Sequence, residues 1–195
     1  MRKVFLILTL LMVSVLTTAC INNFAVQELN NKAKIYLEKG DTEKAISRLK
    51  SSLDLDDSIF ETHYNLAIAY MKAEEYNLAK QSFEKAKSIN DNVAELYYSI
   101  ALCDQQIADI AINNLKSNDN SLKKSQENDV DEENNQDNKK EYNLSLNDIK
   151  LLLNSSIENY QKYIELEKNN NDKEKIEEMI TDIKNQLNEL SEVES

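Results

Sequence analysis

Apolar residues recur at intervals of three and four along most of this chain, with charged and amide side chains between them. The clearest series is Leu66, Ala67 and Tyr70, followed by Ala79, Phe83 and Ala86. Such spacings place each set on one face of a helix. The small Ala67 and Ala79 would let two antiparallel helices approach closely, with Tyr70 and Phe83 filling the volume beside them. We therefore predict a helical hairpin that ends at Asn90 and Asp91.

The pattern returns when the frame is shifted by 34 residues. In the earlier copy, Ala33, Tyr36, Ala45 and Leu49 stand for Ala67, Tyr70, Ala79 and Phe83. A 34-residue period of small and aromatic positions on helix pairs resembles the tetratricopeptide repeat. The resemblance implies two repeats within residues 26–91, each a pair of antiparallel helices. A generic bundle of helical hairpins is the alternative.

The residues at the helix ends and turns match the repeat motif at some positions and depart from it at others. Gly40 occupies the motif's glycine position and is expected to close its helix in the left-handed conformation. In the second repeat Glu74 replaces that glycine, and Asp91 replaces the usual Pro. In the first repeat Ser52 and Asp57 stand where Ala and Pro are usual. The turns must therefore be made without Pro, which the chain lacks.

A third repeat is divided by an insertion. Its first helix is expected over residues 92–115 and its second over residues 147–168, where Ser156 and Tyr160 take the small and large positions. Residues 116–141 between them are rich in Asn, acids and Lys and contain few large apolar side chains. Such a segment cannot bury enough apolar surface to offset its ordering entropy, which predicts a disordered insert.

A last amphipathic helix is expected over residues 172–193. Its apolar face consists of Ile176, Met179, Ile180, Ile183, Leu187 and Leu190. A solenoid needs a terminal helix with a polar outer side, so we interpret this segment as the cap. A short coiled coil or a partner-binding helix is the alternative.

Composition supports an all-α chain. Of 195 residues only one is Gly, and 30% are charged. The predicted fold class is all-α, a short tetratricopeptide-repeat solenoid of antiparallel helix pairs with a C-terminal capping helix. The formal net charge of −12 would repel phosphate backbones and argues against nucleic acid as a ligand.

The N-terminus has the features of an exported protein. Residues 1–19 contain Arg2 and Lys3, then an apolar run and a small-residue exit, which is typical of a signal peptide. Cys20 follows directly and resembles the lipidated cysteine of bacterial lipoproteins, although Thr17 stands where Leu is usual. Residues 20–25 would then be a lipidated tether. Two or more acyl chains would hold the protein on a membrane.

The lipoprotein resemblance implies a place in the bacterial cell envelope, on the periplasmic face of the outer membrane. The expected role is that of an adaptor for envelope proteins, of the kind found in pilus, secretion or outer-membrane assembly. Ordinary signal cleavage would instead release a soluble periplasmic or secreted helical binding protein.

No residue pattern indicates chemistry. His63 has no Cys or second His near it and is expected in the core or at its rim. Cys103 is expected to be a buried small apolar residue. We find no catalytic residues, no metal ligands and no cofactor motif, and expect a protein that is not an enzyme.

The resemblance also implies where a partner segment would bind. In the family, the first helix of each repeat lines a concave groove. The corresponding residues here are Gln27, Asn30, Lys34 and Leu37, then Glu61, Tyr64, Ile68 and Met71, then Glu95, Tyr98, Leu102 and Gln105.

Apolar and aromatic side chains form part of this set, and buried aromatic anchors dominate many interfaces. The predicted partner-binding residues are Tyr64, Ile68, Met71, Tyr98 and Leu102. Tyr64 and Tyr98 are expected to point away from the helix core, so that their loss would hardly alter stability. The alternative is that the cap helix or the long third-repeat helix folds over this stripe.

Overall fold

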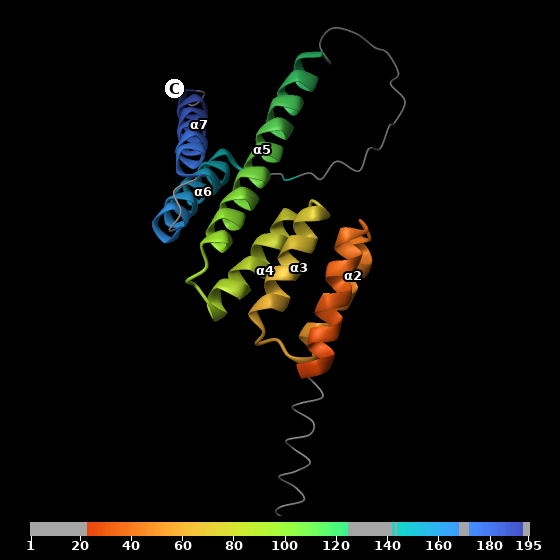
Figure 1. Cartoon of the computed structure of the whole chain (residues 1–195). Helices are drawn as coiled ribbons and strands as arrows, with labels where there is room; N and C mark the ends of the chain where they lie inside the picture. The colour runs from red at the N-terminus through yellow and green to blue at the C-terminus, as the bar shows by residue number, and fades with distance from the viewer. Residues whose placement is uncertain (1–22, 125–141, 143, 168–171, 193–195) are drawn as a thin grey trace, which may run out of the picture. The chain divides into compact units, whose positions relative to one another are not determined.

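The computed structural model describes residues 23–124, 142, 144–167 and 172–192, and its regular structure over these ranges is helical (Figure 1). The helices are residues 23–38, α2 (Thr42–Leu55), α3 (Phe60–Lys72), α4 (Tyr76–Ile89), α5 (Ala94–Lys124), α6 (Leu146–Leu166) and α7 (Lys173–Glu192). No strand occurs in the described ranges, and the all-α prediction is confirmed. Over the same ranges, no helix combines the length and apolar character needed to cross a bilayer. Residues 1–19, predicted to be a signal peptide, lie outside these ranges, as do Cys20 and residues 125–141.

The chain divides into two compact units, Met1–Asp91 and Asn92–Ser195. In the first unit, α3 and α4 pack side by side as the expected hairpin, and α2 packs on α3 (Figure 1). Ala67 and Ala79 are both fully buried, as close approach of the two helices requires. Phe83 is also fully buried beside them.

The two helix ends that close the first helices of the repeats have the same geometry 34 residues apart. Gly40 has a φ of +79°, and Glu74 has a φ of +59° at the equivalent position. After each of them a backbone N–H reaches back to a tyrosine carbonyl, from Asp41 to Tyr36 at 2.9 Å and from Glu75 to Tyr70 at 2.8 Å. These bonds satisfy carbonyls that the helix end leaves open. The left-handed ending predicted at Gly40 is therefore present, and Glu74 adopts it without being glycine.

The second unit is built on α5, which packs along α6, while α6 packs on α7. Ser156, at the small-residue position, is fully buried, and its hydroxyl donates to the Ala101 carbonyl at 2.9 Å. Tyr160, at the large position, is fully buried and donates to Gln105 Oε1 at 3.1 Å. Burial raises the pKa of the Tyr160 phenol, because the phenolate would lose its hydration.

The apolar face of α7 lies on the core of the second unit. Ile176, Ile180 and Ile183 are buried there. The charged face remains exposed, with Glu177 and Glu178 among its residues. This is the contact expected of a capping helix. The start of α6 is fixed by a capping box that the pattern did not predict: the Asp148 N–H donates to Ser145 Oγ at 3.2 Å, and the Ser145 N–H donates to Asp148 Oδ2 at 3.3 Å.

α5 continues further than expected. The prediction ended the third repeat's first helix at residue 115 and placed the insert at residues 116–141, but α5 continues through residues 116–124. The physical reason is that this stretch contains no Gly or Pro to stop the helix, and each added residue gains one backbone hydrogen bond. A helix can continue through its own backbone hydrogen bonds where few apolar side chains are available for burial.

Candidate partner-binding site

The helix of residues 23–38 and α3 line a polar cavity of about 420 Å³ in the first unit. From the first helix come Gln27, Asn30 and Lys34, and from α3 come Glu61 and Asn65. These residues recur at intervals of three and four, so each helix presents them on one face. The remaining lining residues are Asn23, Val26, Asn31 and Ile59. Four of the positions expected in the concave groove thus line a real cavity.

A buried hydrogen-bond network supports the wall of this cavity. Asn30 Nδ2 lies 2.9 Å from Thr62 Oγ1 and 3.0 Å from both Ser52 Oγ and the Val26 carbonyl. Asn65 Nδ2 donates to Asn30 Oδ1 at 3.1 Å. Ser52 and Thr62 are fully buried and also lie within hydrogen-bond distance of each other, at 3.3 Å. The network orients both amides, and it gives a reason for Ser52 where the motif has Ala.

The chemistry of the cavity fits a peptide backbone. Its lining residues carry one cation, Lys34, and one anion, Glu61, and most of its other polar groups are side-chain amides. An amide both donates and accepts hydrogen bonds, as a peptide group does. A phosphate or nucleotide site would need more positive charge than this cavity supplies.

The predicted residues of α3 are half-buried and do not line that cavity. Ile68 and Met71 continue the helix face of Asn65 toward the C-terminal end of α3. The Tyr64 ring is stacked on Phe60 with centroids 5.8 Å apart, and it meets Phe83 edge-on at 5.5 Å. Because Phe83 is fully buried, the expectation that Tyr64 stands clear of the core was wrong.

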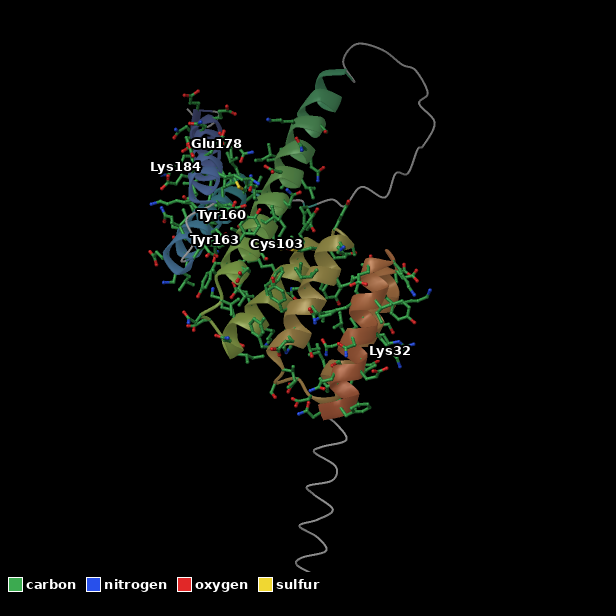
Figure 2. The ribbon with its side chains drawn as sticks, in the orientation of Figure 1. Lys32, Cys103, Tyr160, Tyr163, Glu178 and Lys184 are labelled. Atoms are coloured by element: carbon green, nitrogen blue, oxygen red, sulfur yellow. The ribbon has the colours of Figure 1, made fainter. Side chains whose placement is uncertain are left out.

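In the second unit Tyr98 is covered in part by other helices. Its ring centroid lies 5.7 Å from that of Tyr160 and 5.5 Å from that of Tyr163, both on α6 (Figure 2). It packs against the core cluster that also contains residues of α7, such as Ile176. The expectation that Tyr98 points away from the core was therefore also wrong, and the alternative of a covered stripe applies to it. Leu102 is half-buried.

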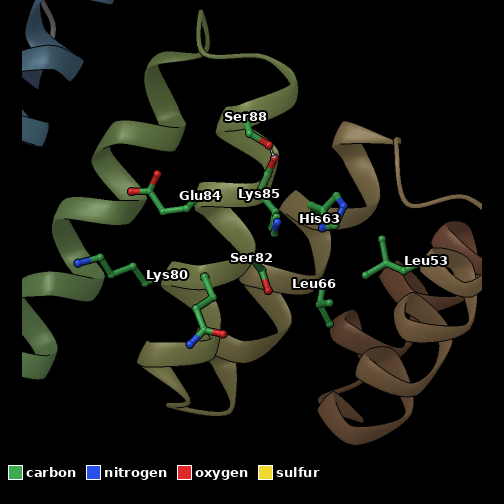
Figure 3. Close-up of a pocket in the computed structure, with 9 residues that line it drawn as sticks. Leu53, His63, Leu66, Lys80, Ser82, Glu84, Lys85 and Ser88 are labelled. Atoms are coloured by element: carbon green, nitrogen blue, oxygen red, sulfur yellow. Dashed lines mark hydrogen bonds between the residues drawn. The ribbon is translucent and has the colours of Figure 1, made fainter.

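A second hollow, of about 600 Å³, lies among α2, α3 and α4 (Figure 3). Leu53 comes from α2 and His63 and Leu66 from α3, while α4 contributes Lys80, Gln81, Ser82, Glu84, Lys85 and Ser88. His63 is nearly buried, and its Nε2 lies 2.7 Å from the Asp57 carbonyl. Sequence reasoning missed this hollow because Leu53 and Leu66 follow the same period as core residues.

Metal-ligating side chains are dispersed in the part of the chain that the structure describes. No group of three or more His, Cys, Asp or Glu in those ranges could hold a metal ion. Cys103 is fully buried, as expected, and His63 lies at the edge of the core.

Two family models match the first unit and its boundary. One is described as TPR repeat and matches residues 33–73, and the other as tetratricopeptide repeat and matches residues 60–93. They cover the segment whose small residues, left-handed helix ends and hairpin packing were described above. The fold is that of the tetratricopeptide repeat. These matches show that residues 33–93 are similar to the tetratricopeptide repeat.

Solved structures with the same fold cover most of the chain. The first TPR domain of human RPAP3 has a TM-score of 0.55 at 16% identity, covering 86% of this chain and 95% of that one. The Sgt2 TPR domain of Aspergillus fumigatus has a TM-score of 0.55 at 14% identity, covering 86% and 82%. The second TPR domain of human RPAP3, in complex with an HSP70 peptide, has a TM-score of 0.54 at 13% identity, covering 84% and 98%. No curated protein matches the sequence.

Proposed function

We propose that this protein is a non-catalytic scaffold that binds an extended segment of a partner protein along α3 and the first helix. The observation that carries the proposal is the amide-lined cavity with Asn30 and Asn65 held in one orientation by the Ser52–Thr62 network. The amides would bond to the backbone of the segment. Ile68 and Met71, further along α3, would take its apolar side chains.

Structures of the same fold give this proposal a precedent. The second TPR domain of human RPAP3 binds an HSP70 peptide, and the TPR2B domain of yeast Sti1 forms a complex with an Hsp70 segment. Their identities to this chain are 13% and 14%, so they support a mode of binding and not a particular partner.

We propose further that acylated Cys20 anchors the protein in the bacterial cell envelope, at the periplasmic face of the outer membrane. The support is the sequence of residues 1–20, with an apolar run and a small-residue exit before Cys20. The partner would then be an envelope protein, of the pilus, secretion or outer-membrane assembly kind. A soluble periplasmic or secreted binding protein is the second candidate.

The anchor can be tested on the mature protein. Mass spectrometry of its N-terminus should show an acylated Cys20 and no residues 1–19. Recovery of a water-soluble product with an unmodified thiol at Cys20 would reject the anchor and favour the soluble candidate.

The binding site can be tested by photo-crosslinking in intact cells. A photoreactive residue at position 68 should give a discrete adduct with one envelope protein, whereas the same residue at the exposed position 47 should not. The double change Lys34→Ala and Asn65→Ala should reduce the adduct about tenfold, as expected for loss of groove contacts. The matched control is Lys32→Ala with Asn77→Ala, which removes the same side chains from exposed positions (Figure 2).

Thermal melts of both double variants separate binding from folding. If the groove variant folds like the control and still gives the full adduct, the segment binds elsewhere. If the photoreactive residue forms the adduct at position 47 and not at position 68, the partner segment also binds elsewhere.

A further inference from the structure

The second unit contains a small cavity that the proposed function does not use. It has a volume of about 180 Å³ and lies among three elements. α5 contributes Glu95 and Tyr98, and α6 contributes Tyr163. Asp172 lies just before α7, which contributes Lys175 and Ile176. This volume is below the range of about 300–1,000 Å³ that is usual for drug-sized ligands. It has room for one small head group.

Two tyrosine rings form the walls of the cavity. The Tyr98 and Tyr163 centroids lie 5.5 Å apart with the planes inclined at 55°, and both residues line the cavity. Both rings are half-buried. Tyr160, fully buried behind them, contacts Tyr98 at 5.7 Å and holds its ring in place. Faces of aromatic rings carry negative charge density, and they attract cations within about 6 Å of the ring centroid.

Carboxylates surround the same rings. Glu95 and Asp172 line the cavity, and Lys175 is its only lining cation. Burial raises the pKa of the Tyr163 phenol, and the nearby charges of Glu167, Asp172 and Glu95 raise it further. The three carboxylates oppose a negative charge at the phenol and would favour a positive charge in the same place.

We propose that this cavity binds a single organic cation, the guanidinium or alkylammonium group of an arginine or lysine side chain. The two rings would contact the head group from the wall that they form together, and Glu95 and Asp172 would accept its hydrogen bonds. Ile176 would contact the aliphatic stem. Lys175 competes for the same carboxylates, so removing its charge should strengthen binding.

Small probes test the cavity without any partner protein, so the result does not depend on the proposed groove. The probe is N-acetylarginine amide, and its uncharged isostere is N-acetylcitrulline amide. NMR titration of the full chain, followed at the ring signals of Tyr98 and Tyr163, should show saturable binding of the arginine probe and at least about tenfold weaker binding of citrulline. The affinities of Nα-acetyllysine amide and of tetramethylammonium are then compared. The comparison distinguishes a site for a cationic side chain from one for free quaternary ammonium ligands.

Variants assign the binding to named groups. Glu95→Gln and Asp172→Asn, both at exposed positions, should each weaken the arginine probe about threefold, and Lys175→Gln should strengthen it to a similar degree. Tyr163→Leu should weaken it more strongly. Glu158→Gln, at an exposed position on α6, is the matched control and should change nothing.

Equal binding of arginine and citrulline probes would overturn the proposal, as would full affinity in the Glu95→Gln and Asp172→Asn variants. Because these two changes are isosteric and lie at exposed positions, the test holds even if Tyr163→Leu fails to fold. Tighter binding of tetramethylammonium than of arginine would reassign the cavity to free quaternary ammonium ligands. If the photo-crosslink from position 68 is absent while the arginine probe still binds, the proposed groove is rejected and the cation site stands.

Discussion

At the scale of single residues, the two left-handed helix ends form an internal comparison. Gly40 adopts a positive φ at little cost, because it has no Cβ. Glu74 adopts a similar φ at the equivalent position, where a side chain costs about 1 kcal/mol or more. The hydrogen bond back to the tyrosine carbonyl is present in both repeats, so the surrounding hairpin holds Glu74 in its strained conformation.

Replacing Glu74 with Gly should therefore stabilise the protein. We expect a gain of about 0.5–1 kcal/mol in the free energy of unfolding, since relief of the strain exceeds the added entropy of the unfolded chain. Urea titration followed by circular dichroism would measure it. The opposite change, Gly40→Ala in the first repeat, should lower the free energy of unfolding by about 1 kcal/mol. A Cβ at Gly40 would meet no atom within 4 Å, so only the backbone conformation acts there. A loss of stability in Glu74→Gly would contradict the strain argument.

Ser52 offers a second test, because the repeat motif has Ala at its position. The Ser52→Ala change should cost about 1–2 kcal/mol despite restoring the motif, since Asn30 and Thr62 lose a buried partner. The matched control is Ser51→Ala. That hydroxyl bonds only to the Ser47 carbonyl one turn away and should cost less than about 0.5 kcal/mol. If the two variants melt alike, the network contributes nothing measurable.

At the scale of the elements, the hairpin of α3 and α4 depends on two fully buried alanines. The Ala67→Leu change would insert a larger side chain where the helix backbones approach, and should cost about 1–3 kcal/mol through overpacking. The control is Asn77→Leu, at an exposed position of α4. Thermal melts of both variants would check this. Equal melting temperatures would mean that the helices can separate to accept the larger residue.

The elements also show how far the sequence predicts this molecule. Spacings of three and four identified α3, α4, α6 and α7, because a helix buries one face whatever lies against it. The same pattern could not say which neighbour covers a face. Tyr64 and Tyr98 lie at groove positions, yet Phe83 covers part of one and α6 part of the other. The amide network was not predicted either, since Asn30 and Ser52 are 22 residues apart and meet only in the fold.

At the scale of the whole molecule, the dominant property is the formal net charge of −12. Ion pairs in the described residues, such as Lys32–Glu28 and Lys162–Glu165, are exposed and lie within one helix turn. Such pairs contribute at most about 1 kcal/mol each and weaken with salt. Repulsion among the excess carboxylates acts over the whole surface and is screened by the same salt. We expect the repulsion to be the larger effect.

The melting temperature should therefore rise by several degrees between about 0.01 M and about 0.3 M NaCl, as the Debye length falls from about 30 Å to well under 10 Å. KCl should give the same rise at equal concentration, which separates screening from ion-specific binding. A fall in melting temperature with salt would show that the exposed ion pairs outweigh the net repulsion.

The ring cluster of Tyr98, Tyr160 and Tyr163 has a consequence for spectroscopy. The chain contains no Trp, so its absorption above the peptide bands comes mainly from its nine tyrosines. Three of these rings are fixed in an asymmetric array, which makes them optically active in the near ultraviolet. A state that keeps its helices but loses fixed packing retains the far-ultraviolet signal and loses the near-ultraviolet one. This protein thus carries native chromophores, the Tyr98, Tyr160 and Tyr163 rings of the second unit among them, that report fixed side-chain packing with no label required.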